Sequence, residues 1–128
     1  MDSPRRSILI IDDEVTIGEL ISDYLKLLNF EAFHAENAEK GIEILKRENP
    51  SVVFLDVIMP RVDGIECLKE IKKISPATIV VMATAVHDEK TAKLAIQYGA
   101  YDYITKPIDF AYLKENILAR IFGAENLD

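Results

Sequence analysis

Cysteine is almost absent from this 128-residue sequence, which contains only Cys67. A single cysteine excludes an internal disulfide framework and a cysteine-rich metal site, and it suits a reducing compartment. Long apolar runs are absent as well, because the longest have the length of a β-strand rather than the roughly 20 residues of a membrane helix. The run that follows Arg5 and Arg6 is also too short for a signal peptide. We therefore expect a cytoplasmic protein with no membrane segment.

Positive charge is scarce: the sequence has 15 Lys and Arg residues and 22 Asp and Glu residues, which gives a net charge of -7 at pH 7. Nucleic-acid affinity relies on clustered Lys and Arg, so direct nucleic-acid binding is disfavoured. The sequence has no glycine-rich phosphate loop of the GxGxxG or GxxxxGK[ST] type, and no Ser-His-Asp or Cys-His set. These absences argue against a small-molecule enzyme on this chain.

Strand-like and helix-like segments alternate along the chain with a repeat of about 20 to 25 residues, which is typical of βα units on a parallel sheet. Strands are predicted near residues 7–11, 31–35, 52–56, 78–83 and 101–104, and helices near 14–28, 38–47, 64–74, 88–98 and 109–121. Helix starts are marked by the capping residues Asn37, Asp63, Asp88 and Asp109. Helix ends are marked by Asn29, Asn49 and Gly99. Cys67 falls on the apolar side of the third helix, which favours a packing role.

The strand-like runs differ in polarity, and this predicts their places in the sheet. Residues 7–11 and 52–55 are almost wholly apolar and should be central, whereas residues 31–35 mix polar with apolar side chains and should form an edge. We predict a single-domain, doubly wound (βα)5 α/β fold of the flavodoxin-like type, with strand order 2-1-3-4-5. The domain should span residues 7–122, between a flexible N-terminal tail at 1–6 and a C-terminal tail or the start of a linker at 123–128.

Polar residues follow the predicted strands at the points where the strands end. These residues are Asp12, Asp13, Asp56, Thr84 and Lys106. Because the carboxyl ends of parallel strands share one edge of the sheet, which is where open α/β sheets bind ligands, we expect these side chains to meet in one pocket.

The chemistry of this set indicates a metal and a phosphoryl group. Three carboxylates at close range repel one another, and a hard divalent cation such as Mg2+ relieves that repulsion with oxygen ligands. Lys106 supplies a second positive charge for a phosphate, and the Thr84 hydroxyl can donate to a phosphoryl oxygen. Asp56, at the end of an apolar central strand, is the candidate nucleophile, since carboxylates accept phosphoryl groups as aspartyl phosphates. Asp12 and Asp13 are candidate metal ligands, one direct and one through water, and the sequence does not separate these two roles.

Four runs of sequence resemble a bacterial two-component response-regulator receiver domain, and together they extend over essentially the whole chain. The runs are IIDDE at 10–14, LDVIMPRVDG at 55–64, MATA at 82–85 and GAYDYITKP at 99–107. Their order and spacing match the family pattern, which makes them far more specific than an isolated pair of aspartates.

The resemblance implies which residues act. A sensor histidine kinase would transfer a phosphoryl group to Asp56, with Mg2+ held by Asp12, Asp13, Asp56 and the backbone carbonyl of Ile58. It also implies a cis peptide bond at Lys106-Pro107 that directs the lysine inward. Such a domain is a signalling module that catalyses its own phosphorylation and dephosphorylation rather than an enzyme acting on a separate substrate.

The resemblance further implies a switch, in which Thr84 and Tyr103 reorient after phosphorylation. The output face would be formed by the fourth helix, fifth strand and fifth helix, and it would control a downstream output domain or protein. Phosphorylation-dependent homodimers are common in the family. Ile58 and Val86 flank the phosphoryl group and are both apolar, so neither can position an attacking water, and we predict a long-lived phosphoryl state.

Other interpretations compete with this one. Each motif could also have a purely structural role. Asp13 could simply cap the first helix, Asp63 with Gly64 could simply form a turn and cap, and Tyr103 could be an ordinary strand aromatic. His87 is expected to be exposed rather than catalytic. The main alternative function is an unphosphorylated pseudo-receiver that acts as a dimerisation or docking module; the intact set of acids and the lysine argue against it, because buried unpaired charges cost several kcal/mol.

Overall fold

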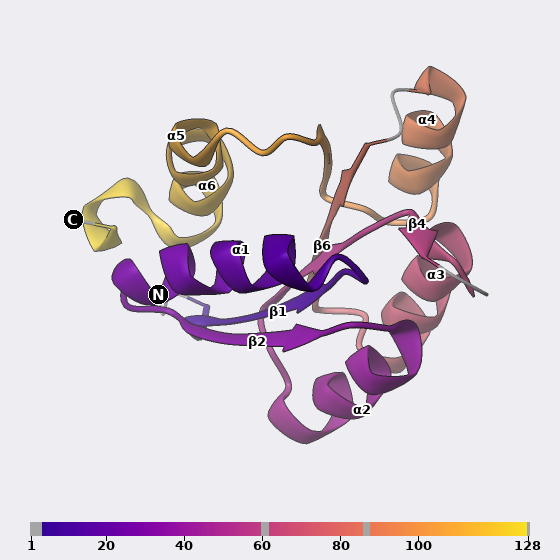
Figure 1. Ribbon diagram of the computed structural model, residues 1–128, viewed down its shortest axis with the longest axis horizontal. Helices are drawn as coiled ribbons and strands as arrows, with labels where there is room; N and C mark the ends of the chain where they lie inside the picture. Colours follow the sequence, from indigo (N-terminus) through magenta and orange to yellow (C-terminus); the bar gives the residue numbers. More distant parts are fainter. Residues whose placement is uncertain (1–3, 60–61, 86–87, 128) are drawn as a thin grey trace.

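A five-stranded parallel sheet forms the centre of the computed structural model, which describes residues 4–59, 62–85 and 88–127 (Figure 1). Its order is β2-β1-β3-β6-β7. The strands are β1 (Ser7–Ile11), β2 (Glu31–Ala35), β3 (Val52–Leu55), β6 (Ile79–Thr84) and β7 (Asp102–Thr105). Since β6 and β7 are the fourth and fifth strands of this sheet, the predicted order 2-1-3-4-5 is confirmed, with the mixed strand β2 at an edge.

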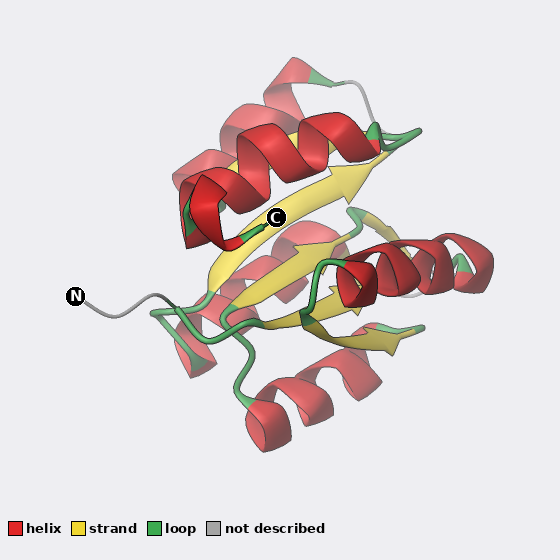
Figure 2. Cartoon of the chain, turned by 90° about the vertical axis from the view of Figure 1, so that its left-hand side faces the viewer, coloured by secondary structure: helices red, strands yellow, loops and turns green. Residues whose placement is uncertain are grey.

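Helices cover both faces of the sheet (Figure 2). They are α1 (Val15–Leu27), α2 (Ala38–Glu48), α3 (Gly64–Ile74), α4 (Glu89–Gln97) and, without interruption, α5 (Phe110–Tyr112), a π-helical segment (Leu113–Leu118) and α6 (Ala119–Phe122). We call the last three together the C-terminal helix. The bounds of the predicted helices and strands differ from the observed ones by at most one residue. In the described part of the chain, no helix combines the length and apolar character needed to cross a membrane.

Successive side chains of a central strand enter two different cores. Leu9 and Ile11 pack in a cluster with residues of α2, α3 and α4. Ile8 and Ile10 pack in a second cluster with residues of α1 and the C-terminal helix. Because both faces are covered, every residue of β1 is buried, which explains its continuous apolar sequence.

The predicted capping residues are confirmed. The side chains of Asn37, Asp63, Asp88 and Asp109 each accept a hydrogen bond from a backbone N–H in the first turn of α2, α3, α4 and α5. Asn29, Asn49 and Gly99, predicted as stops, have φ angles of 66°, 48° and 102°. These left-handed conformations end a helix, and they are adopted most readily by Gly and Asn.

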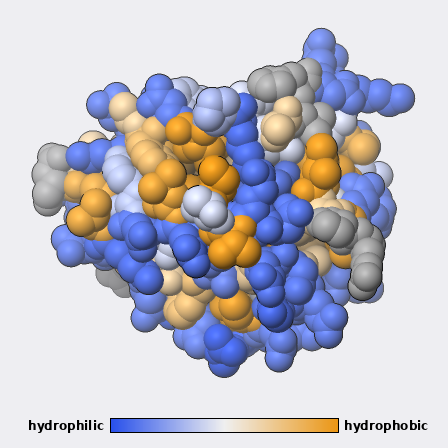
Figure 3. Space-filling view, viewed as in Figure 1, coloured by the Kyte–Doolittle hydropathy of each residue, from blue (hydrophilic) through white to orange (hydrophobic). Residues whose placement is uncertain are grey.

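One aromatic contact joins α1 to the C-terminal helix. The rings of Tyr24 and Phe110 stack with centroids 4.6 Å apart. The Tyr24 hydroxyl donates a hydrogen bond to the backbone oxygen of Phe110 at 3.2 Å. Figure 3 shows apolar side chains gathered where α1 and the C-terminal helix come together, with hydrophilic side chains around them.

Two features were not expected. A short antiparallel hairpin, β4 (Ile58–Met59) with β5 (Val62–Asp63), follows the third strand. Residues near both ends of the chain also pack on the domain: Arg6 bonds to backbone oxygens at the end of α1 and to that of Asn126 at 2.8 Å, and Leu127 is buried. The limits of 7–122 for the domain stay a prediction, but the described flanking residues are not detached from it.

Candidate functional site

Backbone hydrogen bonds continue the sheet for one residue beyond the strands and fix the polar residues that follow. The Asp12 N–H donates to Ala35 O at 3.0 Å, and the Asp56 N–H donates to Ile11 O at 3.0 Å. The Lys106 N–H donates to Thr84 O at 2.8 Å. Each polar residue is therefore held by the neighbouring strand, and the strand-end residues meet at one edge, as the sequence predicted.

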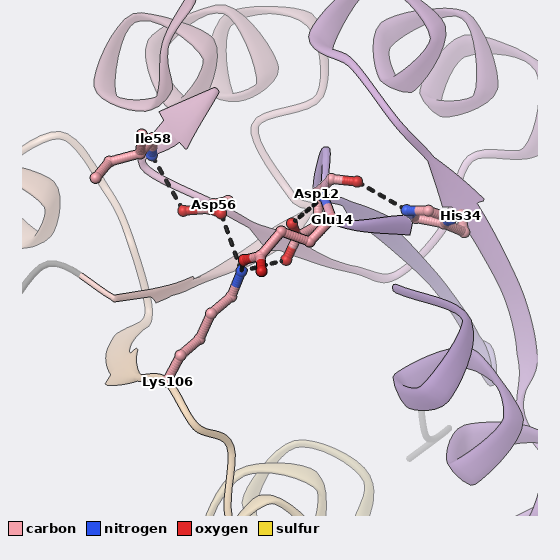
Figure 4. Close-up of polar contacts among 6 residues, drawn as sticks. All are labelled: Asp12, Glu14, His34, Asp56, Ile58 and Lys106. Carbon is pink, nitrogen blue, oxygen red and sulfur yellow. Dashed lines mark hydrogen bonds and ion pairs between the residues drawn. The ribbon is translucent and has the colours of Figure 1, made fainter. Parts of the chain in front are cut away.

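The Lys106 side chain lies between the acids of this edge (Figure 4). Its Nζ is 2.7 Å from Asp12 Oδ2, 3.0 Å from Asp56 Oδ2 and 2.7 Å from Glu14 Oε1. The Lys106-Pro107 peptide is cis, as the resemblance implied. The Lys106 side chain is 9% exposed, and its ammonium group contacts three carboxylates at once.

Asp12 and Asp56 are bound in the same way. Asp12 Oδ1 accepts a hydrogen bond from the Glu14 N–H at 2.9 Å, and Asp56 Oδ1 accepts one from the Ile58 N–H at 3.0 Å. Each carboxylate therefore has one oxygen on a backbone N–H and the other on Lys106. Asp13 is more exposed, yet one carboxylate oxygen of each of the three aspartates lies within 4.8 Å of the others.

The electrostatics of the site are dominated by burial and by a surplus of negative charge. Burial raises the pKa of Asp12, while its hydrogen bond with Lys106 opposes this and the nearby Asp56 charge adds to it. Burial alone would lower the pKa of Lys106, but its hydrogen bonds to Asp12, Glu14 and Asp56 outweigh burial and raise it. The lysine is held as a cation, and its single charge does not balance the carboxylates around it.

The donor set fits a hard divalent cation. The cluster of Asp12, Asp13 and Asp56 offers only oxygen ligands, and its remaining negative charge favours such an ion over a soft metal. Ile58, the fourth residue that the resemblance implied, is directly joined to the cluster through its N–H bond to Asp56. Its carbonyl as a metal ligand stays a prediction.

The two predicted switch residues lie on the last two strands of the sheet, β6 and β7. Thr84 ends β6 and is fully buried, and it is in register with Thr105 of β7. Tyr103 of β7 is partly buried against the cluster of α2, α3 and α4. Burial raises the pKa of Tyr103, and the negative charges of Asp88 and Asp56 add to this.

Glu14 and His34 contact the site but were given no role from the sequence. Glu14 follows the two aspartates in the IIDDE run, which was the available signal, and its carboxylate reaches Lys106. His34 Nε2 lies 2.8 Å from the backbone oxygen of Asp12 (Figure 4). No local sequence signal identifies His34, because its partner is 22 residues away.

The remaining residues singled out in the sequence lie away from the acids or outside the described residues. Cys67 is buried in α3, and burial raises the pKa of its thiol to about 12, which agrees with a packing role. The expectations for Val86 and His87 fall on residues that the structure does not describe.

Comparison with known proteins gives consistent matches. The family model of the response regulator receiver domain matches residues 8–118. Chemotaxis protein CheY of Bacillus subtilis is 40% identical over 101 residues, which cover 78% of this chain and 84% of that protein. A cyclic di-GMP phosphodiesterase of Thermotoga maritima is 36% identical over 111 residues, which cover 87% of this chain but 30% of that protein.

A solved structure adds the same result in three dimensions. The CheX-CheY-BeF3-Mg2+ complex from Borrelia burgdorferi matches with a TM-score of 0.83 and 28% identity, covering 89% of this chain and 87% of that one. This chain spans about half or less of several curated relatives, from 30% to 52% of their length. The family match extends over nearly all of the sheet and its helices, and the four sequence runs lie within it. This chain therefore belongs to the response regulator receiver domain family.

Proposed function

We propose that this receiver domain accepts a phosphoryl group on Asp56 from a sensor histidine kinase, in a Mg2+-dependent reaction, and thereby controls a downstream output. The observation that carries the proposal is the pairing of a buried Asp56 carboxylate with Lys106, next to two further aspartates at the same sheet edge. Burying several like charges around one lysine has a large energetic cost, which packing alone does not explain.

The reaction follows from these groups. An Asp56 carboxylate oxygen attacks the phosphorus of a phosphohistidine, a P–O bond forms, and the P–N bond breaks as the imidazole leaves with its electron pair. The Lys106 ammonium then pairs with one phosphoryl oxygen, and the Thr84 hydroxyl donates to another. The backbone N–H of Ile58 holds Asp56 in place during the attack.

Asp12, Asp13, Asp56 and the carbonyl of Ile58 would hold Mg2+. When bound, the ion offsets the negative charge of both the carboxylates and the incoming phosphoryl group. The complex of the Borrelia burgdorferi relative contains BeF3 and Mg2+, which supports Mg2+ as the ion. The charge surplus described above gives an independent reason for the ion, because Lys106 alone does not neutralise the cluster.

New hydrogen bonds to the phosphoryl group supply free energy of the order that a conformational switch requires. It adds a charge of about -1.5 to -2 and three acceptor oxygens. Charge-assisted hydrogen bonds are worth about 1.5 to 3 kcal/mol each, so new bonds from Thr84 and Lys106 together give about 3 to 6 kcal/mol. Converting a mostly inactive population into a mostly active one requires about 5.5 kcal/mol.

The output face is formed by α4, β7 and the C-terminal helix. Thr84 pairs with Thr105 of β7, two residues beyond Tyr103, so a movement of Thr84 would reach Tyr103 through that strand. A hollow of about 330 Å3 is lined by residues of β7 and the start of the C-terminal helix, among them Tyr103, Pro107 and Tyr112. This hollow, lined by both polar and apolar residues, is where we place the downstream output domain or protein and any phosphorylation-dependent homodimer.

The test is intact-mass measurement after incubation with acetyl phosphate or phosphoramidate, with and without Mg2+. One added phosphoryl group that requires Mg2+ and is lost in Asp56→Asn supports the proposal. Asp63→Asn is the matched control, because Asp63 caps α3 through Ile65 N–H and asparagine caps equally well. Uptake by Asp56→Asn would contradict Asp56 as the acceptor. No uptake by the wild type from either donor or from a kinase phosphohistidine would favour a docking module without phosphorylation.

A further inference from the structure

His34 donates a hydrogen bond to the backbone of the site. Its Nε2 is 2.8 Å from Asp12 O, and since a carbonyl oxygen only accepts, Nε2 carries the hydrogen. The ring is half-buried on the edge strand β2 and points toward Asp12 (Figure 4). This bond lies on the opposite side of Asp12 from its carboxylate contact with Lys106.

The position of the imidazole ring is fixed by Gly18 of α1. A Cβ atom at Gly18 would lie 2.2 Å from His34 Nε2 and 2.5 Å from its Cδ2. The ring therefore fills the space above a residue that lacks a side chain, and α1 keeps it directed toward the end of β1. Packing of this kind holds a donor in one rotamer.

The bonded carbonyl belongs to the peptide group that joins Asp12 to Asp13. Because a peptide group is planar, fixing its oxygen fixes the ψ angle of Asp12 and the φ angle of Asp13 together. The N–H of Asp12 is held as well, by Ala35 O at 3.0 Å. Two adjacent residues of β2, His34 and Ala35, thus orient the backbone that carries two carboxylates of the acidic cluster.

We infer that His34 is a positioning residue for divalent-cation binding: through the Asp12 carbonyl it holds the Asp12-Asp13 peptide in the orientation that directs both carboxylates at one ion. This inference rests on the proposed function, because it concerns the Mg2+ that the cluster would hold. Groups that orient metal ligands typically contribute about 10- to 100-fold to metal affinity. His34 acts through the backbone, so the lower end of that range applies.

The test measures the Mg2+ dissociation constant of the unphosphorylated protein by isothermal titration calorimetry. His34→Leu, which removes the donor, should raise that constant about tenfold. His34→Gln places an amide N–H donor at a similar reach and should restore affinity close to that of the wild type.

Tyr24→Phe is the control, since it removes another hydrogen bond to a backbone carbonyl, that of Phe110, at a place away from the acids. It should leave the Mg2+ dissociation constant unchanged. The inference is overturned if His34→Leu binds Mg2+ as tightly as the wild type, or if His34→Gln is as weak as His34→Leu. A wild type that binds no Mg2+ would overturn the proposed function instead, and this inference with it.

If a His34 variant does not fold, a measurement on the wild type alone still tests the inference. Nitrogen-15 NMR of the histidine rings at about pH 8, where an unperturbed imidazole is neutral, reports which nitrogen carries the hydrogen. The hydrogen on Nε2 of His34 is expected. Finding it on Nδ1 would remove the donor on which the inference depends.

Discussion

Replacement of Lys106 by methionine isolates the charge at the centre of the site. Methionine keeps much of the apolar stem but removes the ammonium that contacts Asp12 at 2.7 Å and Asp56 at 3.0 Å. The side chains of Lys106, Asp12 and Asp56 are 9%, 3% and 5% exposed, so water replaces the lost partner only in part. The variant therefore contains buried carboxylates with no cation between them.

The magnitude follows from this burial. Removing one partner of a buried ion pair costs about 3 to 5 kcal/mol, so we expect the free energy of unfolding to fall by that amount at neutral pH without divalent cations. Burial already raises the pKa of Asp12, and the Lys106 hydrogen bond opposes that rise. The variant should have a still higher Asp12 pKa. Because a raised folded-state pKa gives stability that is present at low pH and lost as pH rises, the deficit should shrink toward about pH 4.

The assay is urea unfolding followed by circular dichroism, at several pH values between about 4 and 7 and with a chelator present. Lys93→Met is the matched control: Lys93 pairs with Glu89 at 3.2 Å, but these side chains are 77% and 83% exposed. Exposed pairs contribute little, so this control should match the wild type. Equal stability of Lys106→Met and the wild type at pH 7, or a deficit that does not change with pH, would refute the reasoning.

Three further predictions concern neighbouring features. Gly64→Ala should destabilise the protein by more than about 2 kcal/mol in urea unfolding, because its Cβ would lie 2.4 Å from the backbone of Val57. Burial raises the pKa of Cys67 from 9.0 to about 12. Above about pH 9 the wild type should therefore lose stability relative to Cys67→Ala, by up to about 1.4 kcal/mol per pH unit. If the free energies of unfolding of the two proteins change with pH in parallel, this prediction is contradicted. Ile58→Asn combined with Val86→Glu should shorten the lifetime of the phosphorylated protein, measured by loss of the added mass; an unchanged decay rate would show that apolar side chains there do not protect the phosphoryl group.

Most of the fold could be predicted because its signals are local. Apolar runs of strand length, the caps at Asn37 and Asp109, and the stops at Asn29 and Gly99 act within a few residues of themselves. The parallel sheet then required only that these elements alternate. The convergence of the strand-end residues also followed from topology, because parallel strands place their carboxyl ends at one edge.

Contacts between distant segments could not be predicted in the same way. The bond from His34 to Asp12 depends on the register of β2 against β1 and on the missing side chain at Gly18. The reach of Glu14 to Lys106 spans 92 residues. The β4-β5 hairpin has two residues in each strand, which is too short to give a periodic signal. In each case the physical cause is tertiary packing, which sequence periodicity does not record.

The hydrogen bonds that prolong the sheet past its strands have a consequence for how the domain opens. The amides of Asp12, Asp56 and Lys106 belong to the same ladder as the buried strands. Hydrogen exchange at the Asp56 amide, which bonds to the central strand β1, should require the rare opening of the central sheet rather than fluctuation of a loop. The sheet thus holds the reactive groups together, so an arriving donor meets a preorganised site and little of its binding free energy is lost in ordering it.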